Sequence, residues 1–181
     1  GIGPEIIAKL FARHPQDAAG CVVVGNVGVM RRAAALLAGP GDLGLPIAQL
    51  ERLSEVAQVP PACLPVLQIS EFPAQLKQGQ VSPLAGQAAA DCIVWAAQAA
   101  LRGEAAAVVT APIHKEALAA AGVPYPGHTE LLQAQAAQFL DKALSEVPVR
   151  MMLANDELRT VLVSIHMSLR DALAAVSFDA V

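Results

Sequence analysis

The most constraining feature of this sequence is the alternation of short apolar runs with longer helical segments. Residues 21–24, 64–69 and 105–110 have the length and apolar content of buried strands. Helical segments at 6–13, 29–37 and 83–102 separate these runs. Strands that alternate with helices usually form a parallel sheet covered by those helices. The sequence therefore predicts an α/β fold.

The segment at residues 83–102 carries the clearest helix signals in the chain. Ser82 is a favourable N-cap, and Pro83 fits a first turn, where its missing N–H group costs nothing. Gly103 fits the position just after a helix C-terminus. These three residues predict the boundaries of this helix.

The last third of the chain has a different pattern. Residues 149–154 and 159–166 are strand candidates, and the Asn155-Asp156 turn between them is typical of an antiparallel hairpin. A helix is expected to follow at 168–176, with Ser168 as its cap. The change in strand pairing predicts a first α/β subdomain at residues 1–126 and the start of a second, dimer-forming subdomain at 127–181.

Composition restricts the classes of function. The 181 residues carry a net charge of −4, which gives no basic surface for nucleic acid. The chain is 55% hydrophobic, yet no run reaches the ~18 consecutive apolar residues of a membrane span. Its three widely spaced cysteines indicate reduced thiols in a cytoplasmic protein. We expect neither a nucleic-acid partner nor a membrane partner.

The first candidate site lies at residues 110–116, where a predicted strand ends and a helix begins. Ligands bind at this edge of open α/β sheets, and the free N–H groups of a helix start attract anions. His114 and Lys115 could add charge-assisted contacts. The alternative interpretation is that both belong to an ordinary solvated first turn, and residue types alone favour that alternative.

The second candidate site is the proline-braced loop at residues 122–130. Its spacing approaches that of a phosphate-binding P-loop, but Pro124 and Pro126 remove the N–H donors that such a loop needs. A stiff loop that delivers His128 and Thr129 to a helix start remains. In one interpretation these two residues bind a ligand. In the other they are structural, with Thr129 as a helix cap and His128 packed against the protein. The residue types alone do not decide between the two.

The third candidate is His166, which ends a predicted strand before a helix. A neutral imidazole there can bind a divalent metal, with Arg170 or Asp171 as outer partners. A lone histidine is more often structural, and a catalytic zinc typically has about three protein ligands.

Several ordered segments resemble motifs of the 4-hydroxythreonine-4-phosphate dehydrogenase family. They are Gly-Ile-Gly-Pro-Glu-Ile at 1–6, TAPIHKEAL at 110–118, AGVPYPGHTE at 121–130, MML at 151–153 with ELR at 157–159, and HMSLRD at 166–171. The resemblance extends over the whole chain, and ordered motifs together are more specific than any one of them.

This resemblance implies a three-layer α/β/α fold like that of isocitrate and isopropylmalate dehydrogenases, with an active-site cleft between two subdomains. It implies a homodimer with shared sites that oxidises 4-phosphohydroxy-L-threonine with NAD or NADP. Decarboxylation to 3-amino-2-oxopropyl phosphate follows, in pyridoxal phosphate synthesis. His128 and Thr129 correspond to substrate contacts and His166 to one of three histidine ligands of a divalent metal (Zn, Mg or Co). We expect His128 to be catalytic and Lys115 to be a weaker candidate for contact with the substrate's negative groups.

The resemblance also indicates which parts this sequence lacks. It opens at Gly1, inside a loop that should follow a strand, and the blocks that carry the other two metal histidines do not occur before Val181. We therefore expect a fragment that covers the N-terminal half to two-thirds and turns over little alone. Two alternatives remain: a related enzyme acting on 4-phospho-threonate or a dihydrodiol carboxylate, and a short non-catalytic binding or dimerisation protein.

Overall fold

The structure is a computed structural model that describes residues 1–41, 43–69, 71, 76–77, 79–165, 167–178 and 180. Its N-terminal part contains a parallel sheet with the order β1-β3-β2. The three strands are β1 (Val23–Gly25), β2 (Ile47–Leu50) and β3 (Leu64–Gln68). The α/β class predicted from the sequence is confirmed.

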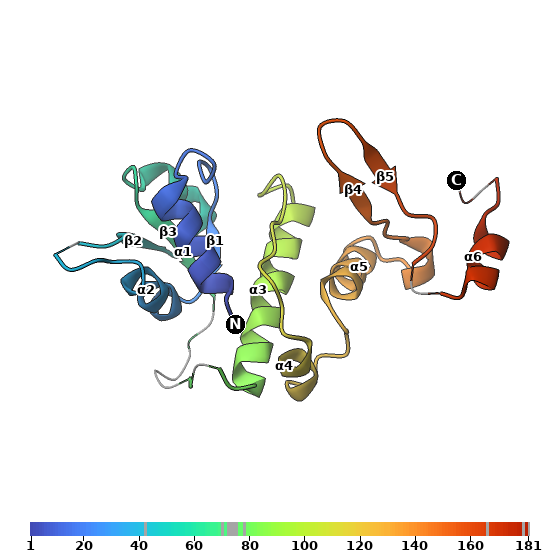
Figure 1. The fold of residues 1–181 in the computed structure, drawn as a ribbon, viewed down its shortest axis with the longest axis horizontal. Helices are drawn as coiled ribbons and strands as arrows, with labels where there is room; N and C mark the ends of the chain where they lie inside the picture. The colour runs from blue at the N-terminus through green and yellow to red at the C-terminus, as the bar shows by residue number, and fades with distance from the viewer. Residues whose placement is uncertain are drawn as a thin grey trace.

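The core of this part forms where two helices pack on the sheet. Helices α1 (Gly3–Arg13) and α2 (Val27–Ala35) bury Ala8 and Met30 against the same cluster as Leu64 and Val66 of β3. Leu64 and Val66 are both 0% exposed, because β3 is the central strand with neighbours on both sides. In Figure 1 these elements form a layered body. Because the three strands are parallel, their carboxyl ends lie at one edge of the sheet.

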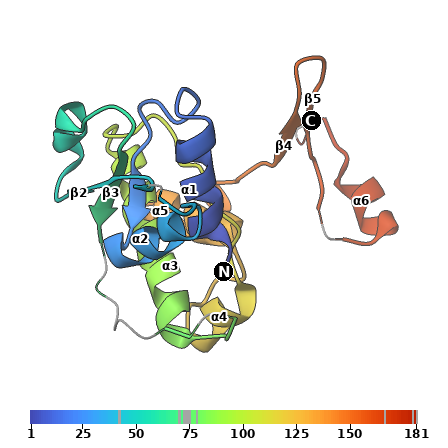
Figure 2. The same cartoon turned by 60° about the vertical axis from the view of Figure 1, so that its left-hand side comes forward.

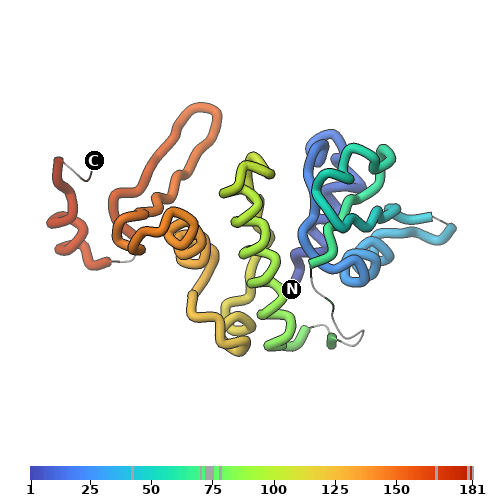
Figure 3. The backbone as a smooth tube through the Cα atoms, turned by 180° about the vertical axis from the view of Figure 1, so that it is seen from behind, coloured from blue at the N-terminus to red at the C-terminus, as the bar shows by residue number. Residues whose placement is uncertain are grey.

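The long helix α3 (Pro83–Leu101) lies between the sheet and the C-terminal helices (Figures 1 and 3). Ser82 caps it, as predicted, by accepting a hydrogen bond from the backbone N–H of Ala85 at 3.4 Å. Gly86 faces α4 (Lys115–Ala120) so closely that a Cβ atom there would overlap the backbone carbonyl of Ala117. This glycine lets the two helix backbones cross at short range.

The predicted strand at residues 105–110 is wrong: the described structure has no strand there. The segment runs beside α3, and the side chain of Val109 is 93% exposed. A strand requires a ladder partner, and the strand order β1-β3-β2 of the described residues supplies none for this segment. Apolar content alone therefore misled the prediction.

Other differences are shifts and one omission. The predicted strand at 21–24 is β1 at Val23–Gly25, and the predicted helix at 29–37 starts earlier. It starts at Val27 because Asn26 caps it, accepting a hydrogen bond from the N–H of Val29 at 3.0 Å. Strand β2 and the short 3-10 helix η1 (Leu53–Gln58) were not predicted.

The C-terminal part begins with α5 (His128–Phe139), which packs on α3. A 3-10 turn, η2 (Leu144–Glu146), is tied to α5 by Gln133, whose amide donates to the carbonyls of Leu144 and Val147. Strands β4 (Met152–Ala154) and β5 (Arg159–Val161) then pair antiparallel, followed by α6 (Leu169–Ala175).

The predicted hairpin and the predicted helix cap in this part are confirmed. The two strands are shorter than predicted, because β4 begins at Met152 and β5 ends at Val161. Asn155 shapes the turn through its side-chain oxygen, which accepts from the N–H groups of Glu157 and Leu158 at 3.0 and 2.7 Å. Ser168 caps α6 by accepting from the N–H of Asp171 at 3.2 Å. Figure 2 shows β4, β5 and α6 standing away from the rest of the molecule, and we call residues 149–165 and 167–178 the arm. The subdomain boundary at residue 127 stays a prediction.

Candidate functional site

Two of the sequence motifs meet at the start of α1. A Cβ atom at Gly3 would lie 3.0 Å from the Cβ of Ala111, so the first turn of α1 lies against the segment that precedes α4. Pro4 occupies the first turn of this helix, where it removes no intrahelical hydrogen bond. The Gly-Ile-Gly-Pro motif and residues 110–114 therefore lie side by side.

His114 has a local structural role that the sequence prediction did not assign. It is the N-cap of α4, and its Nδ1 atom accepts a hydrogen bond from the backbone N–H of Ala117 at 3.3 Å. An acceptor Nδ1 places the imidazole proton of the neutral ring on Nε2. The imidazole is exposed, and this hydrogen bond sets where the helix starts and where Lys115 leaves the backbone.

The proline-braced loop delivers His128 and Thr129 to the first turn of α5, as predicted. The N-cap is Gly127, which has no side chain to satisfy the first-turn N–H groups, so the interpretation of Thr129 as the cap is wrong. Free N–H groups and the helix dipole make this end of α5 attractive to an anion.

His128 and Thr129 are both half-buried at this helix start. Burial lowers the pKa of His128, because desolvation disfavours the charged imidazolium. A lowered pKa keeps the ring neutral at neutral pH, so one nitrogen can accept a proton while the other donates. His128 therefore has the form that a group needs if it is to orient or polarise a hydroxyl.

Lys115 and Glu130 both approach Gly127. A Cβ atom built on Gly127 would lie 4.0 Å from Cε of Lys115 and 3.6 Å from Oε2 of Glu130. The lysine side chain from α4 is thus brought to Gly127, the N-cap of α5. The carboxylate of Glu130 opposes an anion at this helix end, so the cation of Lys115 matters for the net charge there.

His166, the predicted metal ligand, lies outside the described residues. Within the part of the chain that the structure describes, no group of three or more His, Cys, Asp or Glu side chains could hold a metal ion. The described residues alone do not make a metal site, and we derive no catalytic step through a metal. In the same part of the chain, no helix combines the length and apolar character needed to cross a membrane.

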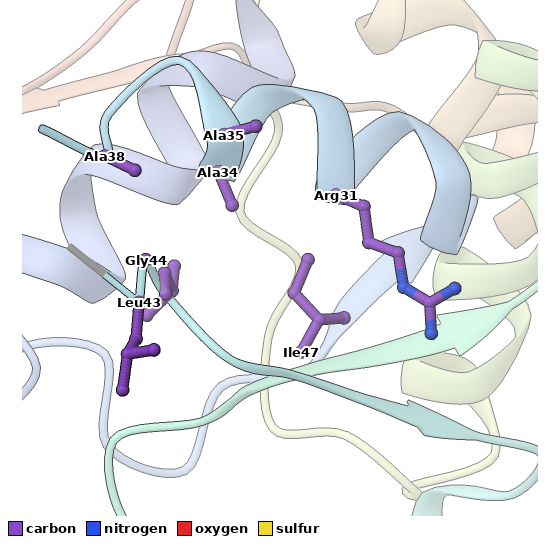
Figure 4. A pocket seen from close by; sticks show the side chains of 8 residues that line it. Arg31, Ala34, Ala35, Ala38, Leu43, Gly44 and Ile47 are labelled. Atoms are coloured by element: carbon purple, nitrogen blue, oxygen red, sulfur yellow. The ribbon is translucent and has the colours of Figure 1, made fainter. Parts of the chain in front are cut away.

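A separate hollow of about 270 Å³ lies between α2 and the segment that leads into β2 (Figure 4). Alanine side chains of α2 form one wall, and Ile47 lies opposite. Among the described residues that line the hollow, the exposed Arg31 is the one cationic side chain. Neither His128 nor Thr129 lines it. This hollow is therefore distinct from the place where the sequence motifs meet.

Comparison with known proteins places these motifs in one family. The family model for the pyridoxal phosphate biosynthetic protein PdxA matches residues 17–181. A 4-hydroxythreonine-4-phosphate dehydrogenase of Beijerinckia indica is 47% identical over 99% of this chain, which covers 49% of that protein. A D-threonate 4-phosphate dehydrogenase of Pectobacterium atrosepticum is 39% identical over 100% of the chain and 52% of its own length.

Solved structures agree with this assignment. A 4-hydroxythreonine-4-phosphate dehydrogenase from Burkholderia phymatum superimposes with a TM-score of 0.82 at 32% identity, over 99% of this chain and 51% of its own. A Klebsiella pneumoniae enzyme of the same name, which has the same α/β/α fold, superimposes with a TM-score of 0.80 at 35% identity. The match covers 99% of this chain and 51% of that enzyme. The chain spans about half the length of the curated relatives it matches. It belongs to the PdxA family of pyridoxal phosphate biosynthetic proteins, whose named relatives are dehydrogenases of phosphorylated threonine or threonate.

Proposed function

We propose that this chain is part of a dehydrogenase that oxidises 4-phosphohydroxy-L-threonine with NAD or NADP. The resulting β-keto acid then loses CO2 and gives 3-amino-2-oxopropyl phosphate, for pyridoxal phosphate synthesis in the cytoplasm. The single observation that carries this proposal is the 47% identity, over 99% of the chain, to a relative named for that substrate. The geometry at the start of α5 fits a phosphorylated substrate and supports the proposal.

In the proposed reaction the substrate lies at the first turn of α5. His128 holds or polarises the substrate near its reacting hydroxyl, and Thr129 contributes a second polar contact. Lys115 contacts a negative group of the substrate, because its side chain lies beside Gly127. The C–H bond at the hydroxyl-bearing carbon breaks, its hydride passes to the nicotinamide ring, and the hydroxyl proton goes to an acceptor that we leave unassigned.

The proposal includes a divalent metal, and His166 is the one residue of this chain that we assign as its ligand. When bound, such a cation (Zn, Mg or Co) would favour the alkoxide of the substrate and stabilise the enolate that forms on decarboxylation. The remaining ligands would come from residues other than those described, since the described residues hold no such group.

A second candidate substrate is D-threonate 4-phosphate. It is favoured by the relatives of that name from Pectobacterium atrosepticum and Salmonella typhimurium, which are 39% and 36% identical to this chain. The two substrates differ at one carbon, which carries an amino group in 4-phosphohydroxy-L-threonine and a hydroxyl group in D-threonate 4-phosphate. The contacts proposed for His128 and Thr129 do not discriminate between them. The same assay can compare the two.

The experiment is a comparison of both substrates with the protein at the length made in the cell. Reduced nicotinamide is followed by absorbance with NAD and with NADP, before and after metal chelation. We expect faster turnover with 4-phosphohydroxy-L-threonine, and a loss of about a hundredfold or more in His128→Ala. His14→Ala is the matched control, because His14 is an exposed histidine at the end of α1. A preference for D-threonate 4-phosphate would favour the second substrate, and no turnover of either would favour a binding role.

We also propose that the protein is a homodimer in which the arm contacts a second copy. The residues of β4 and β5 are all exposed, and α6 has no buried residue. Large apolar side chains lie uncovered along the arm, among them Leu153 at 59%, Leu158 at 65% and Phe178 at 100% exposure. A two-stranded hairpin without packing is marginal in water, so a partner surface is needed to stabilise it.

Light scattering tests this proposed dimer. We expect twice the chain mass for the unmodified protein and a shift to monomer in the double variant Leu153→Ser, Leu158→Ser. The double variant Leu36→Ser, Leu84→Ser is the matched control, because those leucines lie outside the arm and are exposed at 62% and 55%. Monomer behaviour of the unmodified protein, or an equal response of both double variants, would contradict a dimer through the arm.

A further inference from the structure

Helix α4 is too short to hold its own position. It has six residues, and isolated helices of fewer than about 12 residues are marginal in water. Its buried side chains are Ala117 and Leu118, at 7% and 1% exposure, which pack towards α3 at the close crossing provided by Gly86. The His114 cap is the other feature that defines where α4 begins. The orientation of Lys115, the first residue of α4, depends on both features.

The position of Lys115 decides the charge at the start of α5. Cε of this lysine lies 4.0 Å from where a Cβ atom on Gly127 would be. Oε2 of Glu130 lies 3.6 Å from the same point. With Lys115 in place, a cation offsets the carboxylate and the helix start can accept an anion. With Lys115 displaced, Glu130 leaves this end of α5 unfavourable to a phosphate group.

We propose that His114 is a positioning residue of this site. Through the acceptor Nδ1, its imidazole caps α4 and holds the Lys115 side chain beside Gly127, at the start of α5. The inference rests on the proposed function, because it assigns a phosphorylated substrate to that turn. His114 acts through Lys115 and does not touch the substrate itself.

The proposal makes a specific demand on the side chain at position 114. The cap requires a hydrogen-bond acceptor that reaches the N–H of Ala117, not a histidine as such. Asparagine supplies a side-chain oxygen and is among the most favoured N-cap residues, whereas alanine supplies no acceptor. His114→Asn should therefore restore what His114→Ala removes.

The test measures position and affinity separately in the unmodified protein, His114→Ala and His114→Asn, with His14→Ala as control. Position is read from the nuclear Overhauser contact between the Lys115 Hε protons and the Gly127 Hα protons. Affinity is read by titrating inorganic phosphate and following the backbone amides of His128 and Thr129. We expect His114→Ala to lose the contact and to bind phosphate about tenfold more weakly. His114→Asn and His14→Ala should stay within about twofold of the unmodified protein.

The outcomes separate this inference from the proposed function. If His114→Ala keeps the lysine contact, or if His114→Asn fails to restore it, the positioning role is overturned. If the contact is lost but phosphate affinity is unchanged, His114 is structural only and the inference fails while the substrate site stands. If the unmodified protein shows no phosphate response at His128 and Thr129, the substrate site itself is overturned.

Discussion

The sheet body and the arm differ in what holds them together. In the body, Leu64 and Val66 of β3 are 0% exposed and lie in a cluster shared by two helices and two strands. In the arm, a hairpin and a helix form with correct turns and caps, yet none of their residues is buried. Local hydrogen bonds thus define the turn and the helix cap of the arm. Of these two regions, the sheet body has the apolar burial that dominates folding stability.

The largest expected effect comes from the same substitution made in each region. Leu64→Ala removes a fully buried side chain and should cost about 2–5 kcal/mol of unfolding free energy. Leu158→Ala removes one that is 65% exposed and should cost less than about 0.5 kcal/mol. Urea unfolding followed by circular dichroism, at concentrations too low for association, measures both. Equal losses would show that the arm belongs to the same cooperative unit as the body.

A smaller effect should follow from adding one methyl group where α3 crosses α4. In a helix interior, alanine is intrinsically better than glycine by about 1 kcal/mol. Gly86→Ala should nevertheless destabilise the protein by about 1–3 kcal/mol, because the new Cβ overlaps the Ala117 carbonyl and pushes α4 away. Thermal unfolding measures the change.

Gly39→Ala is the control for this variant. Gly39 is exposed and has no heavy atom within 4 Å of its Cβ position, so alanine should leave the free energy of unfolding within about 0.5 kcal/mol. A gain in stability from Gly86→Ala would mean that the helix crossing is looser than the structure has it.

The smallest expected effect compares two serine caps. Ser82 and Ser168 each accept one backbone N–H hydrogen bond, at the start of α3 and of α6 respectively. Ser82→Ala should lower the free energy of global unfolding by about 1 kcal/mol, because α3 packs against β1, α4 and α5. Ser168→Ala should leave global unfolding unchanged and only speed hydrogen exchange within α6. A matching global loss from Ser168→Ala would show that α6 is coupled to the body.

The sequence by itself determined the features that depend on neighbouring residues. Ser82 and Ser168 identified two helix starts, and Asn155 identified the hairpin turn, because caps and turns are hydrogen bonds across two or three positions. The start of α5 at His128 was also predictable from its proline-braced loop. The roles of His128, Thr129 and His166 stay predictions.

Only the tertiary structure decided which distant segments meet. Residues 105–110 have strand-like composition but lack a ladder partner among the described residues, and β2 is a strand because β3 lies beside it. The approach of Lys115 to Gly127 depends on Gly86, which lies 29 positions before Lys115 (115 minus 86). The missing side chain of Gly86 lets α4 cross α3 at short range. Pairing and close packing are properties of two surfaces at once, so no local pattern in either segment encodes them.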